Sequence, residues 1–140
     1  MQFKLNDGGR NSAGYKGVAG DCVCRAIAIT TGLPYQTVYD DLIRIKESMR
    51  QTKRIKTSHP RTGVNKKVYQ SYLNQLGWKW TPTMKLGTGC QVHLKDDELP
   101  AGALIVRLSK HLTAVIDGVL NDTYDCSRNG QRCVYGYYSK

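Results

Sequence analysis

The sequence lacks several features that would assign it to a familiar class. No apolar run approaches the roughly 20 residues of a membrane-spanning helix, and the first ten residues, MQFKLNDGGR, lack the apolar stretch of a secretory signal. Internal repeats and low-complexity segments are also absent. These absences exclude a membrane-spanning helix and a repeat array, and they favour a protein that acts in a cytoplasm.

Acidic residues are scarce: 11 stand against 21 Lys and Arg, which gives a net charge of +10 over 140 residues. Residues 44–67, here called the basic segment, hold nine basic residues and one acid, whereas the rest of the chain holds twelve and ten. With 40% apolar residues, the chain has the size and composition of a single domain, 1–140. We therefore expect a nearly neutral domain in which the basic segment binds a partner.

Cysteines are few and odd in number: Cys22, Cys24, Cys90, Cys126 and Cys133. An odd count without an export signal argues against a disulfide framework, so we expect reduced thiols. Small size and the lack of a targeting signal are typical of bacterial or bacteriophage proteins. The expected location is the cytoplasm, that of the host if a phage encodes the chain.

Hydrophobic periodicity predicts helices in the first half of the chain. Residues 1–20 form an irregular lead-in, in which Gly14, Gly17 and Gly20 allow close turns. A helix over 22–31, capped by Asp21 and ended by Gly32, is apolar nearly all round and is predicted to be central and buried. Further helices are expected over 34–50 and 63–76, with an exposed basic loop over 50–61 between them.

The second half of the chain favours strands. Short strands are expected within 78–95, followed by strands over 103–108, 111–116, 119–125 and 132–138. Asp117-Gly118 is typical of a two-residue hairpin turn. Helices followed by an antiparallel sheet indicate an α+β fold.

Cys22 is the first candidate for chemistry. At the start of a helix its thiol meets the positive end of the helix dipole, which favours the thiolate. The backbone N–H groups of Cys22 and Val23 can receive a developing oxyanion there. Cys24 lies about 200° around the same helix, by its 3.6-residue period, and is expected in the core.

A nucleophilic thiol needs a base and a group that orients the base, and the predicted hairpin supplies both. With Asp117-Gly118 as the turn, Thr113 pairs with Asp122, so Asp122 becomes a diagonal neighbour of His111. A register slip of one residue would place Asn121 there instead, and a Cys-His-Asn triad is equally workable. The sequence thus predicts a triad of Cys22, His111 and Asp122.

The segment Gly20-Asp-Cys-Val-Cys-Arg-Ala-Ile-Ala28 resembles the nucleophile segment of ovarian tumour-type deubiquitinases, and the order Cys…His…Asp resembles papain-like cysteine peptidases. The resemblance covers about nine residues around Cys22 and the later hairpin. It implies a papain-like fold and a hydrolase that cleaves a peptide, isopeptide or other amide bond. Lys16 stands where papain-like enzymes place a glutamine as oxyanion donor, so the oxyanion hole would be built from the backbone, would use Asn11 or Lys16, or would be absent. Ala19 replaces the acid that is usual in the deubiquitinase pattern.

Those two departures favour an alternative, a catalytically inactive papain-like module. Its basic segment would dock nucleic acid or an acidic host protein. The residues proposed for that contact are Arg50, Lys53, Arg54, Lys56 and Arg61, with Tyr35, Tyr39, Tyr69 and Tyr72 as nearby stacking candidates, and His59 is expected to be solvated.

A structural zinc site is the remaining competitor. Cys90-Gln-Val-His93 has CxxH spacing, and Cys126 and Cys133 could complete a tetrahedral set. In a strand, however, CxxH places its two side chains on opposite faces. We therefore expect no metal and no cofactor.

Overall fold

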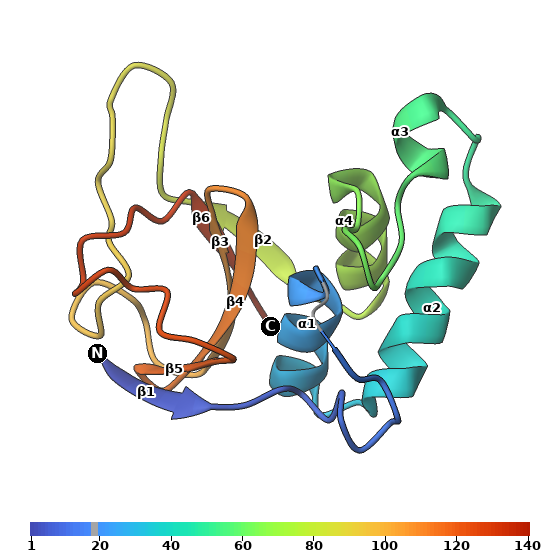
Figure 1. Cartoon of the computed structure of the whole chain (residues 1–140). Coiled ribbons are helices and arrows are strands. Elements are labelled where there is room, and N and C mark those ends of the chain that lie inside the picture. The colour runs from blue at the N-terminus through green and yellow to red at the C-terminus, as the bar shows by residue number, and fades with distance from the viewer. Residues whose placement is uncertain (18–19) are drawn as a thin grey trace.

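The computed structural model describes residues 1–17 and 20–140, which form a six-stranded sheet and four helices (Figure 1). The helices are α1 (Cys22–Thr31), α2 (Tyr35–Ser48), α3 (Lys53–Lys56) and α4 (Lys66–Gln75). The strands are β1 (Gln2–Leu5), β2 (Lys79–Pro82), β3 (Ala103–Leu108), β4 (His111–Ile116), β5 (Val119–Asp122) and β6 (Gly136–Ser139). The predicted α+β class is confirmed.

The sheet has the strand order β1-β5-β4-β3-β6-β2. Its neighbours are antiparallel except β1 and β5, which are parallel. β4 and β5 form the predicted hairpin: Ile116 pairs with Val119, and both Asp117 and Gly118 have positive φ, as a tight two-residue turn requires. β5 ends at Asp122, three residues earlier than predicted.

Both faces of the sheet are covered. On one face α1 packs between the sheet and helices α2 and α4 (Figure 1), where Ile27 and Val38 join Ile105 and Ala114 in one core. A second core gathers strand residues such as Val106 and long-loop residues on the other face. The central position of α1 is therefore confirmed, and Gly32 ends it in a left-handed conformation with its N–H on Ala28.

Several predicted elements differ from the structure. β1 lies within the expected irregular lead-in; it is only four residues long and its side chains are all exposed. α3 interrupts the expected loop over 50–61, where Ile55 is buried and Thr52 caps the turn. α2 and α4 are shorter than the predicted helices, only β2 forms within 78–95, and the last strand begins at Gly136.

The prediction of reduced thiols is wrong for one pair. Cys90 and Cys133 form a disulfide, with their Cα atoms 5.8 Å apart, because a β-bridge between His93 and Cys133 brings the two segments together. Cys22, Cys24 and Cys126 are free. Since disulfides are rare in cytosolic proteins, the cytoplasmic location stays a prediction. No helix in the described part of the chain is both long and apolar enough to cross a membrane.

Candidate active site

The three predicted triad residues meet at one end of α1. Cys22 is the first residue of α1, His111 is the first residue of β4, and Asp122 is the last residue of β5. Cys22 and His111 open onto a cavity of about 690 Å³, here called the cleft. Its lining residues come from 7–17, 20–25 and 110–124, and those that matter below are Arg10, Asn11, Lys16, Asp21, Arg25 and Tyr124.

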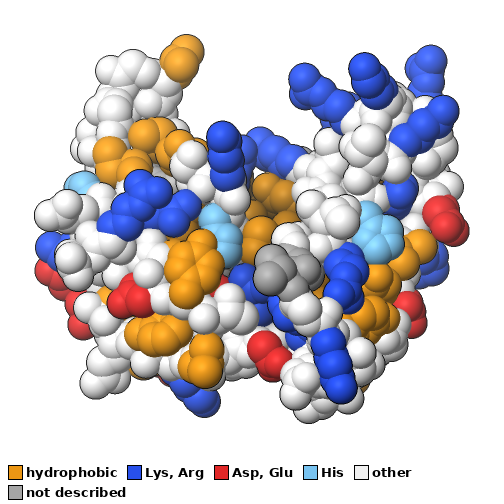
Figure 2. Space-filling view, in the orientation of Figure 1, with side chains coloured by type: hydrophobic (Ala, Val, Ile, Leu, Met, Phe, Trp, Pro, Cys, Tyr) orange, Lys and Arg blue, Asp and Glu red, His pale blue; other side chains and the backbone are white. Residues whose placement is uncertain are grey.

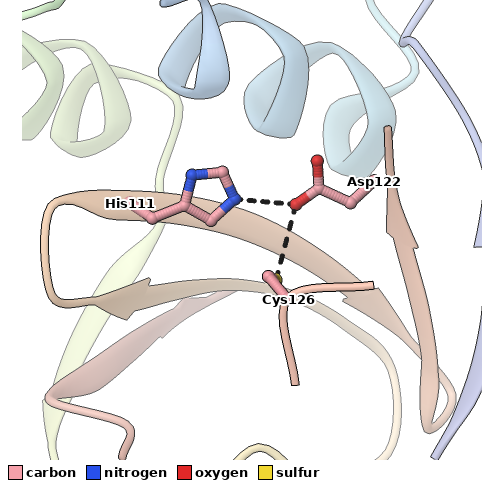
Figure 3. A group of neighbouring side chains, drawn as sticks. All are labelled: His111, Asp122 and Cys126. Carbon is pink, nitrogen blue, oxygen red and sulfur yellow. Dashed lines mark hydrogen bonds and ion pairs between the residues drawn. The ribbon is translucent and has the colours of Figure 1, made fainter. Parts of the chain in front are cut away.

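His111 and Asp122 are hydrogen-bonded, as the hairpin register predicts. The Nε2 atom of His111 lies 2.8 Å from Oδ2 of Asp122, and the second ring nitrogen points away from the carboxylate (Figure 3). Asp122 is 1% exposed. Because Nε2 is engaged with Asp122, Nδ1 is the nitrogen left for the thiol of Cys22.

The carboxylate of Asp122 accepts hydrogen bonds on both oxygens. Oδ2 accepts from the Thr113 hydroxyl at 2.6 Å as well as from His111. Oδ1 accepts from the guanidinium of Arg25 at 2.9 Å and from the backbone N–H of Thr123 at 2.7 Å. These donors fix the carboxylate and thereby fix the ring of His111.

Arg25 is a site residue to which the sequence patterns gave no role. Its guanidinium is buried and spans two carboxylates, Asp122 from β5 and Asp21 at 2.5 Å. Asp21 also accepts from the Tyr35 hydroxyl at 2.7 Å and lies 3.5 Å from Arg10. One feature of the sequence could have identified Arg25: it stands four residues after Asp21, which is the spacing of an ion pair, on an otherwise apolar helix.

Asp21 does not cap α1 with its side chain, contrary to the prediction. Its oxygens are directed to Arg10, Arg25 and Tyr35 instead. The N–H groups of Cys22 and Val23 in the first turn therefore stay clear of the Asp21 carboxylate. Such helix-start N–H groups suit an oxyanion.

The electrostatics of the site favour a charged pair. Burial alone would raise the pKa of Cys22, but hydrogen bonds from His111 and the Leu112 backbone, with the charges of His111 and Arg25, hold it below its usual 9.0. Burial alone would lower the pKa of His111, but hydrogen bonds with Asp122, Cys126 and Cys22 raise it to about 11. Burial opposes ionisation of Asp122, yet His111 and Thr113 hold its pKa well below the usual range. The surroundings therefore stabilise the thiolate of Cys22 relative to an ordinary thiol, and they keep the ring of His111 protonated near neutral pH.

The two side chains predicted as oxyanion donors lie in similar settings. Lys16 and Asn11 both line the cleft, and both are exposed. The backbone carbonyl of Lys16 accepts a hydrogen bond from Arg61 at 2.5 Å. Ala19, the position of the missing acid, lies outside the described residues.

The alternative third member, Asn121, is not beside His111. Its side-chain oxygen accepts a hydrogen bond from Asn6, and its side-chain nitrogen donates to the Val119 carbonyl. The register therefore selects Asp122 as the neighbour of His111.

The four residues considered for zinc do not form one site. Cys90 and Cys133 are in the disulfide, while Cys126 lies 3.7 Å from Asp122. The segment around Cys90 is not a strand, so the expected opposite orientation is wrong: Sγ of Cys90 lies 3.6 Å from Nε2 of His93.

Within residues 1–17 and 20–140, His111, Asp122 and Cys126 are the one group of three metal-ligating side chains (Figure 3). Both Asp122 oxygens already accept hydrogen bonds from Arg25, Thr113 and Thr123. This carboxylate is thus held as a partner of His111 rather than presented to a cation.

The basic segment divides into an exposed part and a part that reaches the cleft. Arg50, Lys53, Arg54 and Lys56 are exposed, and Lys and Arg side chains gather over α3 in Figure 2. Arg61 instead bonds Lys16 and lies over the ring of Tyr15. A Cβ on Gly20 would lie 3.1 Å from the Thr62 carbonyl, so this stretch packs directly beside the start of α1.

The aromatic residues near the basic segment are mostly not available for stacking. Tyr35, Tyr69 and Tyr72 are buried in the core, and Tyr39 is half-buried against Tyr15. His59 is not solvated as predicted: it accepts a hydrogen bond from the Arg61 backbone and packs edge-on against Tyr39.

Comparison of the chain with protein-family models, curated proteins and solved structures finds no match. The functional argument therefore rests on the geometry and electrostatics of the site.

Proposed function

We propose that this protein is a papain-like cysteine hydrolase that cleaves a peptide, isopeptide or other amide bond. The observation that carries the proposal is the hydrogen bond of 2.8 Å between His111 and Asp122, beside a thiol whose pKa is lowered. A buried carboxylate that holds one ring nitrogen leaves the other free to act on Cys22. This is the arrangement that nucleophilic thiol catalysis requires.

The reaction follows from these positions. The thiolate of Cys22 adds to the amide carbonyl, and the N–H groups of Cys22 and Val23 stabilise the oxyanion. The C–N bond then breaks as the protonated His111 gives its proton to the leaving amine, which yields a thioester on Cys22. His111 next takes a proton from water, whose oxygen attacks the thioester, and the acid is released with the thiolate restored.

Alkylation by iodoacetamide tests the activated thiol. At pH 6.5 we expect Cys22 in the folded protein to react at least about tenfold faster than Cys22 in the urea-unfolded chain, because only the folded pKa is lowered. Cys24 is the internal control, since it is 0% exposed and burial raises its pKa to about 12. Peptide mapping by mass spectrometry assigns each site. Equal rates in the folded and unfolded chains would contradict the proposal.

A binding function is the second candidate, favoured by the exposure of Lys53, Arg54 and Lys56 on α3. An acidic host protein or a nucleic acid would dock there, with affinity that falls steeply as salt is added. Charge reversal at the three residues should abolish binding to an RNA or DNA oligomer. Binding that does not respond to salt or to the reversal would remove this candidate.

A further inference from the structure

A second, smaller cavity adjoins the thiol, and none of the described residues before Cys22 is among its lining residues. This side pocket has a volume of about 290 Å³ and shares Cys22, Lys110 and His111 with the cleft. Its other lining residues are Val23, Gly63, Val64, Lys66, Tyr69, Arg107 and Leu112. Cys22 therefore borders two cavities, and a substrate bound at its thiol can extend into either.

The side pocket is basic, and no Asp or Glu of the described chain lines it. Lys66, Arg107 and Lys110 do line it, and none of the three takes part in the salt bridges found among residues 1–17 and 20–140. The cleft differs, because Arg10 and Arg25 there contact carboxylates. In Figure 2 Lys and Arg side chains surround the hollow between the sheet and the helices.

The three cations come from separate elements that hold them around one space. Arg107 is paired within β3 to Leu112 and Gly136, Lys110 occupies the β3–β4 turn with a φ of 54°, and Lys66 begins α4. Below them the pocket wall is apolar, from Val64 and Leu112 among others. An aliphatic stem on this wall with an anionic end among the cations is the complementary shape.

We propose that the side pocket binds a carboxylate of a polypeptide substrate, an Asp or Glu side chain close to the scissile amide. This inference rests on the proposed hydrolase function and names its substrate class. Tyr69, the one Phe, Tyr or Trp among the described residues that line the pocket, is 5% exposed, so it offers no open ring for a nucleic-acid base. An acidic peptide therefore fits the pocket better than a single-stranded nucleic acid.

The first experiment compares a charged and a neutral alkylating reagent on Cys22. The ratio of the iodoacetate rate to the iodoacetamide rate reports the field at the thiol without reference to substrate orientation. We expect the triple variant Lys66→Gln/Arg107→Gln/Lys110→Gln to lower this ratio at least about fivefold at low salt, and added salt to lower it in the wild type. An unchanged ratio would overturn the inference.

A matched variant removes the same charge elsewhere. Lys4, Lys79 and Lys85 are exposed and line neither the cleft nor the side pocket. Their triple change to Gln should leave the ratio within about twofold, because salt screens distant charges. An equal fall in both variants would mean that net charge alone sets the ratio, which also overturns the inference. Slow iodoacetamide alkylation of wild-type Cys22 would instead count against the proposed hydrolase.

The second experiment uses protection. Acetyl-Gly-Glu-Gly-amide should slow iodoacetamide alkylation of Cys22 at least about twofold more than acetyl-Gly-Gln-Gly-amide at the same concentration, because only the Glu peptide carries an anion for the three cations. The side-pocket variant should lose the difference. Equal protection, or none from either peptide, contradicts the carboxylate site. Protection by an oligouridylate without protection by the Glu peptide would replace the acidic peptide by nucleic acid.

Discussion

The charged residues around Asp122 are buried, whereas those on α3 are exposed to solvent. The side chain of Arg25 is 6% exposed and its guanidinium contacts two carboxylates, whereas Lys53, Arg54 and Lys56 are exposed. None of these three belongs to a salt bridge within the described residues. A buried charge has to be paired, so it fixes geometry, while an exposed one costs little and stays available to a partner.

The largest expected effect is on stability, from Arg25. Arg25→Met leaves Asp21 and Asp122 without their shared buried partner, and breaking such a pair typically costs about 3–5 kcal/mol. Arg44→Met is the matched control, because Arg44 is 63% exposed in its pair with the half-buried Asp41, and such a surface pair is expected to contribute less than about 1 kcal/mol. Urea unfolding followed by circular dichroism measures both. Similar losses in the free energy of unfolding for the two variants would show that the buried and the exposed ion pairs contribute equally to stability.

The second effect concerns how stability varies with pH. The raised pKa of His111 adds stability that is full below pH 6.5 and is lost as the pH rises toward 11. The lowered pKa of Cys22 acts in reverse and adds stability as the pH rises toward 9.0. Because the two terms oppose each other, wild-type stability should fall less steeply with pH below 9.0 than the His111 term alone would make it.

Cys22→Ala removes the opposing term and should reveal the His111 contribution. Stability of this variant should fall by up to about 1.4 kcal/mol for each pH unit between about pH 7 and 9. Chemical unfolding at several pH values gives both curves. Parallel curves for the variant and the wild type would show that Cys22 and His111 do not share a charged pair.

The third effect is on reactivity. His111→Gln removes the hydrogen bond and the charge that lower the pKa of Cys22, so the midpoint of its alkylation profile should move up by about one pH unit or more. At about pH 6.5 the iodoacetamide rate then falls about tenfold. His59→Gln is the matched control, because His59 packs against Tyr39 and lines neither the cleft nor the side pocket. A midpoint that does not move in the His111 variant would show that His111 does not lower the pKa of Cys22.

The smallest expected effect comes from α3. The triple variant Lys53→Gln/Arg54→Gln/Lys56→Gln should change the free energy of unfolding by less than about 0.5 kcal/mol, because exposed residues without partners contribute little. Thermal unfolding gives the comparison. A loss as large as that from Arg25→Met would mean that the basic segment is part of the folded framework rather than a surface for a partner.

Local signals were enough to predict the elements that carry the triad. α1 follows from an apolar sequence ended by Gly32, and the hairpin follows from β-branched residues around Asp117-Gly118. Because the register of a two-residue hairpin is fixed by its turn, the proximity of His111 and Asp122 followed as well.

Long-range partners could not be predicted in the same way. Arg25 and Asp122 are 97 positions apart, and nothing in a local pattern pairs them. Asp21 has the residue type and position of a helix cap, yet its tertiary contacts with Arg10, Arg25 and Tyr35 prevail. The bond between Cys90 and Cys133 depends on a bridge between two irregular segments, which composition does not show.

The parallel pairing of β1 with β5 has a consequence for the order in which the site forms during synthesis. The register joins Gln2 to Val119 and Leu5 to Asp122, and the Asn6 N–H donates to the Asp122 carbonyl. At the usual rates of translation, about 5–20 s separate the synthesis of Cys22 from that of Asp122. Throughout that time the nascent chain carries an ordinary thiol. Strand β1 gains its partner only when Asp122, which orients His111, has been made, so the proposed active site is completed as one of the last events of folding.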